Sequence, residues 1–253
     1  MFPQERHEFI VGKAQAESRV DVASLANELD VTPETIRRDL TVLERQGFVR
    51  RVHGGAIAVE KLRFEPNVST RLRTFEAEKD RIGRRAALEI PESSTVLLDA
   101  GTTTAVIARH LPAGGELTVV TNSVAIAALL EDRNDVSVFI LGGRLRARTL
   151  AATGDWAIDA LASVHVDIAF MGTNGISTTR GLTTPDQAEA STKAAMIASA
   201  ERTVVVSDHS KFGVAHFARF ARIDDIDLVI TDTDLDEETA HDMETAGPRV
   251  VRV

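Results

Sequence analysis

Residues 35–55 read TIRRDLTVLERQGFVRRVHGG and hold two arginine pairs, Arg37–Arg38 and Arg50–Arg51. The whole chain is acidic, with 38 Asp and Glu against 29 Lys and Arg and a net charge of −9. Between residues 31 and 55, however, five arginines stand against three acidic residues. Positive charge is therefore concentrated in this stretch, which is a local feature that the average composition of the chain does not show.

The first arginine pair lies in a segment with clear helix signals. Thr32 is a good N-cap residue and Pro33 suits the first helical position. Apolar residues then recur at helical spacing until Gly47, which predicts a helix ending near Gln46. The inward positions are Ile36, Leu40 and Leu43.

The flanking residues predict a winged helix-turn-helix over residues 1–57. Apolar spacing predicts a first helix over 3–17 and a second over 22–29, joined by a short extended link, RVDV. After the third helix, FVRRVHGGAIAV alternates apolar and polar residues around a Gly-Gly turn, which predicts a two-stranded hairpin.

In such a fold the third helix enters the DNA major groove. Arg37 and Arg38 would point away from the core, and arginine suits contacts to guanine or phosphate. The predicted DNA-binding residues are Thr32, Pro33, Thr35, Arg37, Arg38, Arg50, Arg51, His53 and Gly54. Two alternatives remain open: the arginines form a solvated helix face with ion pairs, or the unit binds another protein.

Composition limits the class of protein. The chain has 253 residues, 43% of them apolar, and no cysteine, which excludes disulfides and thiolate metal sites. The charged N-terminal stretch does not resemble a signal peptide, and no apolar run is long enough to span a bilayer. The seven histidines show no metal-ligand spacing. These features predict a cytoplasmic protein with no metal and no membrane partner.

The remainder of the chain has a different rhythm. Residues 58–78 are polar and predict an irregular linker. From residue 79 to 253, short apolar strands alternate with helical segments, which predicts an α/β domain with a parallel sheet. The predicted strands are 94–99, 117–121, 136–143, 166–172, 203–208, 226–232 and 249–253, and the predicted helices include 103–110, 124–131 and 187–200.

Several predicted strands end in polar or glycine residues, where parallel sheets bind ligands. DAGTTT, residues 99–104, leads from a strand into a helix and could hold a phosphate, although the motif taken alone favours a plain helix-capping turn. Asp186, Glu189 and Lys193 would share one helix face. The alternative there is a solvated Glu189–Lys193 pair.

The chain also resembles a known family. VDVASLANELDVTPETIRRDLTVLERQGFVRRVHGGA is similar to the DNA-binding domain of DeoR-type bacterial transcriptional regulators. DAGTTT, VVTNS, LGG, GTNGI, GLTTPD and DHSKFG, in this order, resemble the sensor domain of the same family. That domain is Rossmann-like and similar in fold to ribose-5-phosphate isomerase, glucosamine-6-phosphate deaminase and the CoA transferases. The resemblance thus covers nearly the whole chain.

The resemblance implies a phosphorylated sugar as effector and no cofactor. Lys193 and Lys211 would pair its phosphate, while Asp186 and Glu189 would accept its hydroxyls. The implied effector-binding residues are Asp99, Gly101, Thr102, Thr103, Thr121, Asn122, Gly142, Gly143, Asn174, Asp186, Glu189, Lys193 and Lys211.

The predicted function is a repressor of a sugar uptake or catabolism operon, binding operator DNA as a homo-dimer or homo-tetramer. A fructose phosphate is the first candidate effector; a pentose, galactitol or amino-sugar phosphate is also compatible. The prediction is that the chain is not an enzyme. The alternative is a sugar-phosphate isomerase or deaminase with an accessory DNA-binding domain.

Overall fold

The computed structural model describes residues 3–17, 19–59, 65 and 68–253. The chain divides into two compact units, residues 1–67 and 68–253, and each is described by itself. Within the described part of the chain, no helix is both long and apolar enough to cross a membrane. The two predicted classes of unit, a winged helix-turn-helix and an α/β domain with a parallel sheet, are both present.

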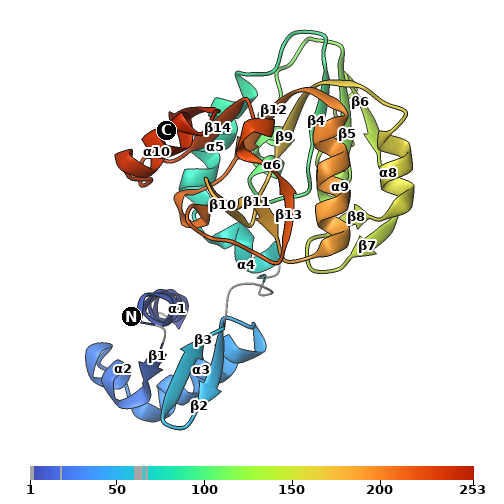
Figure 1. Ribbon diagram of the computed structural model, residues 1–253. Coiled ribbons are helices and arrows are strands. Elements are labelled where there is room, and N and C mark those ends of the chain that lie inside the picture. The colour runs from blue at the N-terminus through green and yellow to red at the C-terminus, as the bar shows by residue number, and fades with distance from the viewer. Residues whose placement is uncertain (1–2, 18, 60–64, 66–67) are drawn as a thin grey trace. The chain divides into compact units, whose positions relative to one another are not determined.

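In its described residues, the first unit has three helices and a small antiparallel sheet (Figure 1). Its core is formed by apolar residues from all three helices, including Ile10, Leu25, Ile36, Leu40 and Leu43, each almost fully buried. The helices are α1 (Pro3–Glu17), α2 (Val22–Glu28) and α3 (Pro33–Arg45), and the strands are β1 (Arg19–Asp21), β2 (Val49–Val52) and β3 (Gly55–Ala58).

The wing has three strands rather than the two that the sequence predicts. Residues 19–21, expected as an extended link, form β1 and pair with β3, so the strand order is β1-β3-β2. The close approach depends on Gly55, because a Cβ atom there would lie 2.0 Å from the carbonyl oxygen of Val20. A strand of three residues is too short to show an alternating pattern, which is why the sequence did not reveal it.

The prediction of an irregular linker over 58–78 is wrong for its second half. Residues 68–73 form helix α4 (Val68–Arg73), and helix α5 (Glu76–Ala87) begins inside the predicted linker. The amino group of Lys79 donates hydrogen bonds to the carbonyl oxygens of Arg71 and Thr74, both at 2.5 Å. A six-residue helix is held by such tertiary contacts and not by its own propensity, so polar composition concealed it.

The second unit is built on a parallel sheet of seven strands in the order β15-β14-β12-β9-β4-β5-β6. All seven occur where the sequence predicts strands, with bounds that differ by up to three residues. They are β4 (Thr95–Leu98), β5 (Leu117–Thr121), β6 (Val136–Ile140), β9 (Val166–Met171), β12 (Ala200–Val206), β14 (Leu228–Thr231) and β15 (Arg249–Arg252).

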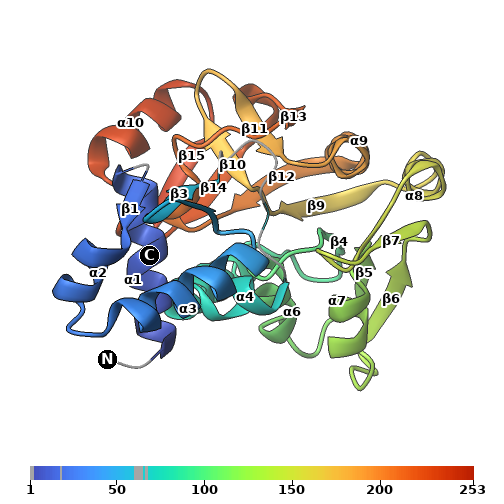
Figure 2. The same ribbon diagram turned by 90° about the horizontal axis from the view of Figure 1, so that it is seen from below.

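Helices cover both faces of this sheet. One apolar core contains residues of α5, α6 (Thr104–Arg109) and α7 (Val124–Leu129). The other contains residues of α8 (Asp155–Leu161), α9 (Gln187–Ala198) and α10 (Glu237–Thr245). Figure 2 shows the sheet between α8 and α9 on one side and α6 and α7 on the other. Both faces being covered explains the near-continuous apolar strands in the sequence.

Five short strands were not predicted. β7 (Arg144–Arg146) and β8 (Ala151–Thr153) form a hairpin, and β10 (Gly175–Ser177), β11 (Gly181–Thr184) and β13 (Ala218–Ala221) form a separate antiparallel sheet. Residues 141–143, predicted as the end of a strand, instead lead from β6 into this hairpin.

The strand order also locates a point where the chain reverses direction across the sheet. From β4 the chain adds β5 and β6 on one side, and it then returns to place β9 on the other side of β4. Ligands of open parallel sheets bind beyond the carboxyl ends of the strands at such a point. The residues that follow β4 and β9 are therefore the first place to look for a binding site.

Candidate functional site

The first candidate site is the surface of α3 that faces away from the core. Thr32 caps the helix by accepting a hydrogen bond from the N–H of Thr35 at 3.2 Å, with Pro33 in the first turn. Arg37 and Arg38 are both exposed. Arg37 forms an ion pair with Glu34 at 3.0 Å, and both side chains are largely in solvent, so the pair is weak and easily exchanged for another partner.

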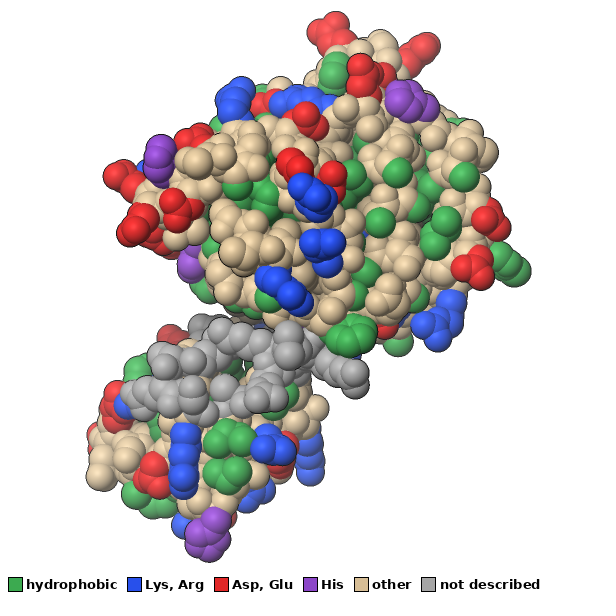
Figure 3. Space-filling model, in the orientation of Figure 1, with side chains coloured by type: hydrophobic (Ala, Val, Ile, Leu, Met, Phe, Trp, Pro, Cys, Tyr) green, Lys and Arg blue, Asp and Glu red, His purple; other side chains and the backbone are tan. Residues whose placement is uncertain are grey.

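The wing supplies the second arginine pair and a tight turn. Arg50 and Arg51 are exposed on β2, and His53 and Gly54 form the turn to β3, where Gly54 has a φ of 78°. Arg51 is held against α3, because its Nη1 donates to the hydroxyl of Thr41 at 3.0 Å. Figure 3 shows a histidine at the tip of this unit with Lys and Arg side chains above it.

Asp39 has a different position from its neighbours on α3. It is 5% exposed and accepts hydrogen bonds from Arg6 at 2.5 and 3.1 Å and from Nε2 of His7 at 2.9 Å. Burial alone would raise the pKa of Asp39, but the bonds from Arg6 and His7 lower it. Asp39 therefore ties α1 to α3 and is not part of the exposed surface, a role that its place in the helix pattern did not indicate.

Basic residues are distributed unevenly between the units. Residues 1–67 contain 10 Lys and Arg against 11 Asp and Glu, and residues 68–253 contain 19 against 27. Figure 3 shows acidic side chains gathered over α10 in the second unit. The first unit is thus nearly neutral overall while α3 and the wing carry five exposed arginines, which is the charge pattern of a local nucleic-acid interface.

The second candidate site lies at the reversal point of the sheet. Asp99 follows β4, is fully buried, and is paired with the amino group of Lys193 from α9. The N–H of Gly172, which follows β9, donates to Oδ2 of Asp99 at 3.0 Å, and Lys193 also donates to the carbonyl oxygen of Gly172 at 3.0 Å. The other carboxylate oxygen of Asp99, Oδ1, is buried and has no hydrogen-bond partner among the described residues.

Two polar residues after β5 hold the neighbouring strand ends in place. The hydroxyl of Thr121 donates to the carbonyl of Leu98 at 2.6 Å. Asn122 accepts from the N–H of Ala100 at 2.9 Å and donates to the carbonyl of Ala152 at 3.1 Å. The side chains of these two predicted effector residues are therefore already engaged in fixing the shape of the carboxyl edge.

The acidic residues at the start of α9 meet an arginine that sequence reasoning missed. Asp186 caps α9 by accepting from the N–H of Glu189 at 3.0 Å. Arg146, at the end of β7, lies 3.2 Å from Asp186 and 2.8 Å from Glu189. Asp186, Glu189 and Lys193 do share a helix face, but each acidic group pairs with Arg146 and Lys193 pairs with Asp99. Only the β7–β8 hairpin brings Arg146 here, and that hairpin left no signal in the sequence.

The remaining predicted residues lie around this edge with less specific contacts. Thr102 and Thr103 are buried in the turn before α6, but Thr103 does not cap the helix; Thr104 instead donates from its hydroxyl to the carbonyl of Asp99 at 2.6 Å. Gly101 is part of the same turn. Gly142 and Gly143 are exposed after β6, and Asn174 accepts from Nε2 of His216 through its carbonyl at 3.2 Å.

Lys211 belongs to another cluster, at the end of β12. Its amino group lies 2.9 Å from the hydroxyl of Ser210 and 3.8 Å from the carboxylate of Asp208, which is buried. Burial opposes the charge on Asp208, but the nearby Lys211 and the hydroxyl of Ser210 lower its pKa. Lys79 is buried nearby, and burial lowers its pKa to about 8 although the charge of Asp208 opposes this shift.

His209 and two acidic residues also come together. Ligand atoms of His209, Asp232 and Asp234 lie within 4.8 Å of one another, an arrangement that no spacing in the sequence indicated. Asp232 is nevertheless occupied, because it accepts from Nδ1 and the N–H of His209, both at 2.8 Å, and from the N–H of Asp234 at 3.1 Å. These hydrogen bonds connect the end of β12 to the end of β14, which gives the cluster a structural role.

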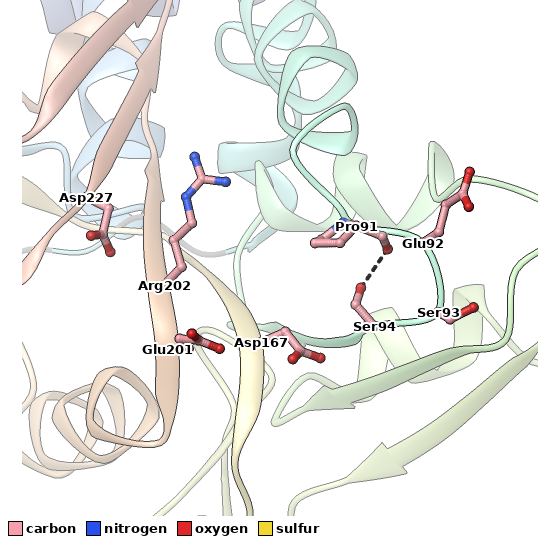
Figure 4. A pocket seen from close by; sticks show the side chains of 8 residues that line it. All are labelled: Pro91, Glu92, Ser93, Ser94, Asp167, Glu201, Arg202 and Asp227. Atoms are coloured by element: carbon pink, nitrogen blue, oxygen red, sulfur yellow. Dashed lines mark hydrogen bonds between the residues drawn. The ribbon is translucent and has the colours of Figure 1, made fainter.

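A hollow of about 500 Å³ lies at the opposite, amino edge of the sheet (Figure 4). Four carboxylates and one arginine line it, so it would repel a phosphate. Asp167 and Asp227 accept hydrogen bonds from strand N–H groups at 2.7 and 2.8 Å, which gives them a structural role. Its lining is Pro91, Glu92, Ser93, Ser94, Asp167, Glu201, Arg202 and Asp227.

Comparison with known families matches both units. Residues 6–61 match the DeoR-like helix-turn-helix domain, and residues 74–233 match the DeoR C terminal sensor domain. A ribose 5-phosphate isomerase from Methanocaldococcus jannaschii is similar to 55% of the chain and 55% of its own, at 18% identity and a TM-score of 0.41.

Curated relatives match over nearly the full chain. The HTH-type transcriptional regulator GlpR of Haloferax volcanii is 39% identical, covering 99% of this chain and 98% of its own. The HTH-type transcriptional repressor GlcR of Bacillus subtilis is 37% identical, covering 92% and 89%. The Glycerol-3-phosphate regulon repressor of Escherichia coli is 33% identical, covering 90% of each chain. These relatives are named as transcriptional regulators or repressors, in agreement with the prediction of a regulator rather than an enzyme.

Proposed function

Because the chain belongs to the DeoR family of helix-turn-helix transcriptional regulators, we propose that it represses a sugar uptake or catabolism operon and is released by a phosphorylated sugar. The observation that carries this proposal is the pairing of two surfaces in one chain. One unit exposes five arginines on α3 and the wing, and the other keeps a buried carboxylate with one unbonded oxygen at the reversal point of its sheet.

The DNA-binding surface in this proposal has two parts. Arg37 and Arg38 at the start of α3 contact base edges or phosphates in the major groove. Arg50, Arg51 and His53 contact the backbone beside it. Such a regulator acts where the chromosome is, so we place it in the cytoplasm. The pseudo-symmetry of operators that such domains bind favours a homo-dimer or homo-tetramer.

The effector in this proposal binds at the carboxyl edge of the sheet. The unpartnered Oδ1 of Asp99 is an acceptor that a sugar hydroxyl could satisfy, which removes the cost of a buried, unpaired oxygen. Lys211, whose side chain is 36% exposed, supplies a cation for the phosphate. The charges of Lys193 and Arg146 are already compensated by Asp99, Asp186 and Glu189, so we assign them to shaping the site.

The mechanism is thermodynamic linkage. An effector releases DNA only if it binds the DNA-incompetent state more tightly than the DNA-bound state. A fructose phosphate remains the first candidate, and the name of the Escherichia coli relative adds glycerol 3-phosphate.

The test is fluorescence anisotropy with DNA from upstream of the gene, at stated salt concentrations. The panel contains fructose 1-phosphate, fructose 6-phosphate, glucose 6-phosphate, glycerol 3-phosphate and the sugars without phosphate. We expect salt-sensitive binding that one phosphorylated compound abolishes. Binding that no compound changes would contradict the effector assignment and leave the DNA assignment standing.

Variants separate the two surfaces. Replacing Arg37 and Arg38 together by Ala should weaken specific binding by at least about tenfold and reduce the slope of log K against log salt by about 2. The matched control is Arg84→Ala, an exposed arginine of α5 in the other unit, which should leave both quantities unchanged. Normal operator affinity in the double variant would contradict the DNA-binding assignment.

A further inference from the structure

The edge of the seven-stranded sheet at β6 is unusually apolar for a surface. β6 pairs with β5 on one side and, within the described residues, with no strand on the other (Figure 2). Its sequence, VSVFI, contains no charged residue. Phe139 is 60% exposed and Ile140 is 53% exposed. A bare apolar strand edge is a template for pairing with another chain.

The opposite edge of the same sheet, at β15, is protected from pairing with another strand by charged side chains. β15 reads RVVR, with an arginine at each end, and Arg252 forms an ion pair with Glu237 at 3.1 Å. Charged side chains on an edge strand discourage pairing. The chain therefore protects one edge of its sheet with charged side chains and leaves the other edge apolar.

Helix α7 extends the apolar surface beyond the strand. It packs against β6 and exposes Val124 and Leu129 by 44% and 46%, together with Ala125 and Ala128. These positions form one stripe of the helix. We call the exposed apolar residues of α7 and β6 the β6 edge surface; they are Val124, Ala125, Ala128, Leu129, Phe139 and Ile140.

We propose that the β6 edge surface is the interface with a second copy of this chain, in which two β6 strands pair antiparallel about a twofold axis at Val138. The backbone geometry permits this register. The N–H of Leu141 donates to the carbonyl of Thr121 on β5 at 2.8 Å, so the backbone groups of Val138 and Ile140, at alternate positions, point away from β5. Val138 would then face Val138 of the partner subunit.

The charges flanking β6 are complementary in this register. Asp132 and Asp135 precede the strand and Arg144 follows it, and all three are exposed. In an antiparallel pair centred on Val138, Asp132 would face Arg144 of the partner subunit, and the symmetric contact forms at the other end. A parallel pairing would place like charges together. The charge pattern thus favours a second copy over an unrelated strand.

The second unit alone carries this interface, and its use on DNA rests on the proposed function. A twofold axis in this unit would present two winged helices to the two halves of a palindromic operator. The test is therefore made without DNA, so that a failure of this interface and a failure of operator binding are separate results.

The experiment is sedimentation equilibrium of the full chain over a range of concentrations. We expect the wild type to associate, and Phe139→Lys to raise the dissociation constant of the β6-mediated dimer at least about tenfold. Leu88→Lys is the control, because Leu88, the residue that follows α5, is 79% exposed and lies outside the β6 edge surface. Circular dichroism verifies that both variants fold. A wild type that is monomeric at about 100 μM, or an association that Phe139→Lys does not weaken, overturns the proposal.

Charge reversal tests the register itself. Asp132→Arg and Arg144→Glu should each weaken the dimer, and the variant with both changes should regain most of its affinity, because the facing charges are again opposite. Hydrogen exchange should also show the amides of Val138 and Ile140 protected in the wild-type dimer and unprotected in Phe139→Lys. Absence of any recovery in the double variant, together with unprotected amides in the wild type, overturns the antiparallel register.

Discussion

At the scale of single residues, buried charged side chains in this chain connect helices and strands that are distant in the sequence. Asp39 joins α1 to α3, and Asp99 joins β4 to α9 and β9. Both are carboxylates whose partners lie more than 30 residues away in the sequence. Removing one member of such a pair leaves the other charge buried and uncompensated, which costs more than the pair itself contributes.

Replacing Asp39 by Asn should lower the free energy of unfolding of the first unit by about 2 kcal/mol, because Arg6 loses its buried partner. The pKa of Asp39 is lowered in the folded state, so its stabilising contribution is present above the ordinary carboxyl pKa of about 4 and is lost as the pH falls through the folded value. Urea unfolding of the wild type and the variant at several pH values measures both the loss of unfolding free energy and its dependence on pH. Glu34→Gln, which breaks an exposed pair, should change stability by less than about 0.5 kcal/mol; equal effects of the two variants would contradict the assignment.

The pair of Asp99 and Lys193 leads to a second prediction. Lys193→Met should destabilise the second unit by about 3–5 kcal/mol, because Asp99 is fully buried. Adding Asp99→Asn to that variant should recover part of the loss, since the uncompensated charge is then removed. Chemical unfolding of the two variants provides the comparison, and a double variant no more stable than the single one would argue against a coupled pair.

At the scale of elements, the sequence predicted the helices and strands that carry a clear apolar pattern, and it missed the shortest ones. The seven core strands are near-continuous apolar runs between helical segments, and α3 carries an apolar pattern at helical spacing, so their existence and type were predictable. β1 and β7 have three residues each and α4 has six, and all three depend on partners elsewhere in the chain. The same limit applies to the candidate site: Asp99 and Lys193 could be placed near the sheet edge, but Arg146 could not, because its hairpin was not predicted.

Two glycines should respond in opposite directions to the same substitution. Gly12 is exposed inside α1 with no atom close to an added Cβ, so Gly12→Ala should raise the stability of the first unit by about 0.5–1 kcal/mol. Gly55→Ala should lower it by about 2 kcal/mol or more, because the Cβ meets the backbone of β1. Thermal unfolding measured on both variants would show whether β1 is an integral strand of the wing; a harmless Gly55→Ala would mean that it is not.

At the scale of the whole molecule, the start of the second unit is tied to a predicted effector residue. Lys79 donates to the carbonyl of Arg71 in α4 and to that of Thr74 just after it, and the charges of Asp208 and Lys211 beyond β12 act on it. The ring of Phe75, which has a φ of 54°, packs edge-on against His209 at 4.8 Å. A structural change around residues 208–211 would therefore act, through Lys79, on α4, the helix that begins the second unit.

The lowered pKa of Lys79 makes this connection measurable. Between its folded pKa of about 8 and the ordinary value of 10.5, the unfolded chain binds more protons, so raising the pH through this window stabilises the fold. Relative to Lys79→Met, the wild type should gain about 2–3 kcal/mol in unfolding free energy between pH 7.5 and 10. Urea unfolding of both proteins at each pH gives the difference, and a difference that does not change with pH would mean that Lys79 is solvated.

The unequal charge of the two units has a consequence for how the protein finds its target. Residues 68–253 hold eight more acidic than basic residues, while residues 1–67 hold one more. At short range the DNA backbone repels the larger unit and attracts the arginines of α3 and the wing, within about 10 Å at 0.1 M salt. If the protein binds operator DNA as we propose, encounters that lead with the larger unit are disfavoured by this repulsion, and productive encounters lead with α3 and the wing.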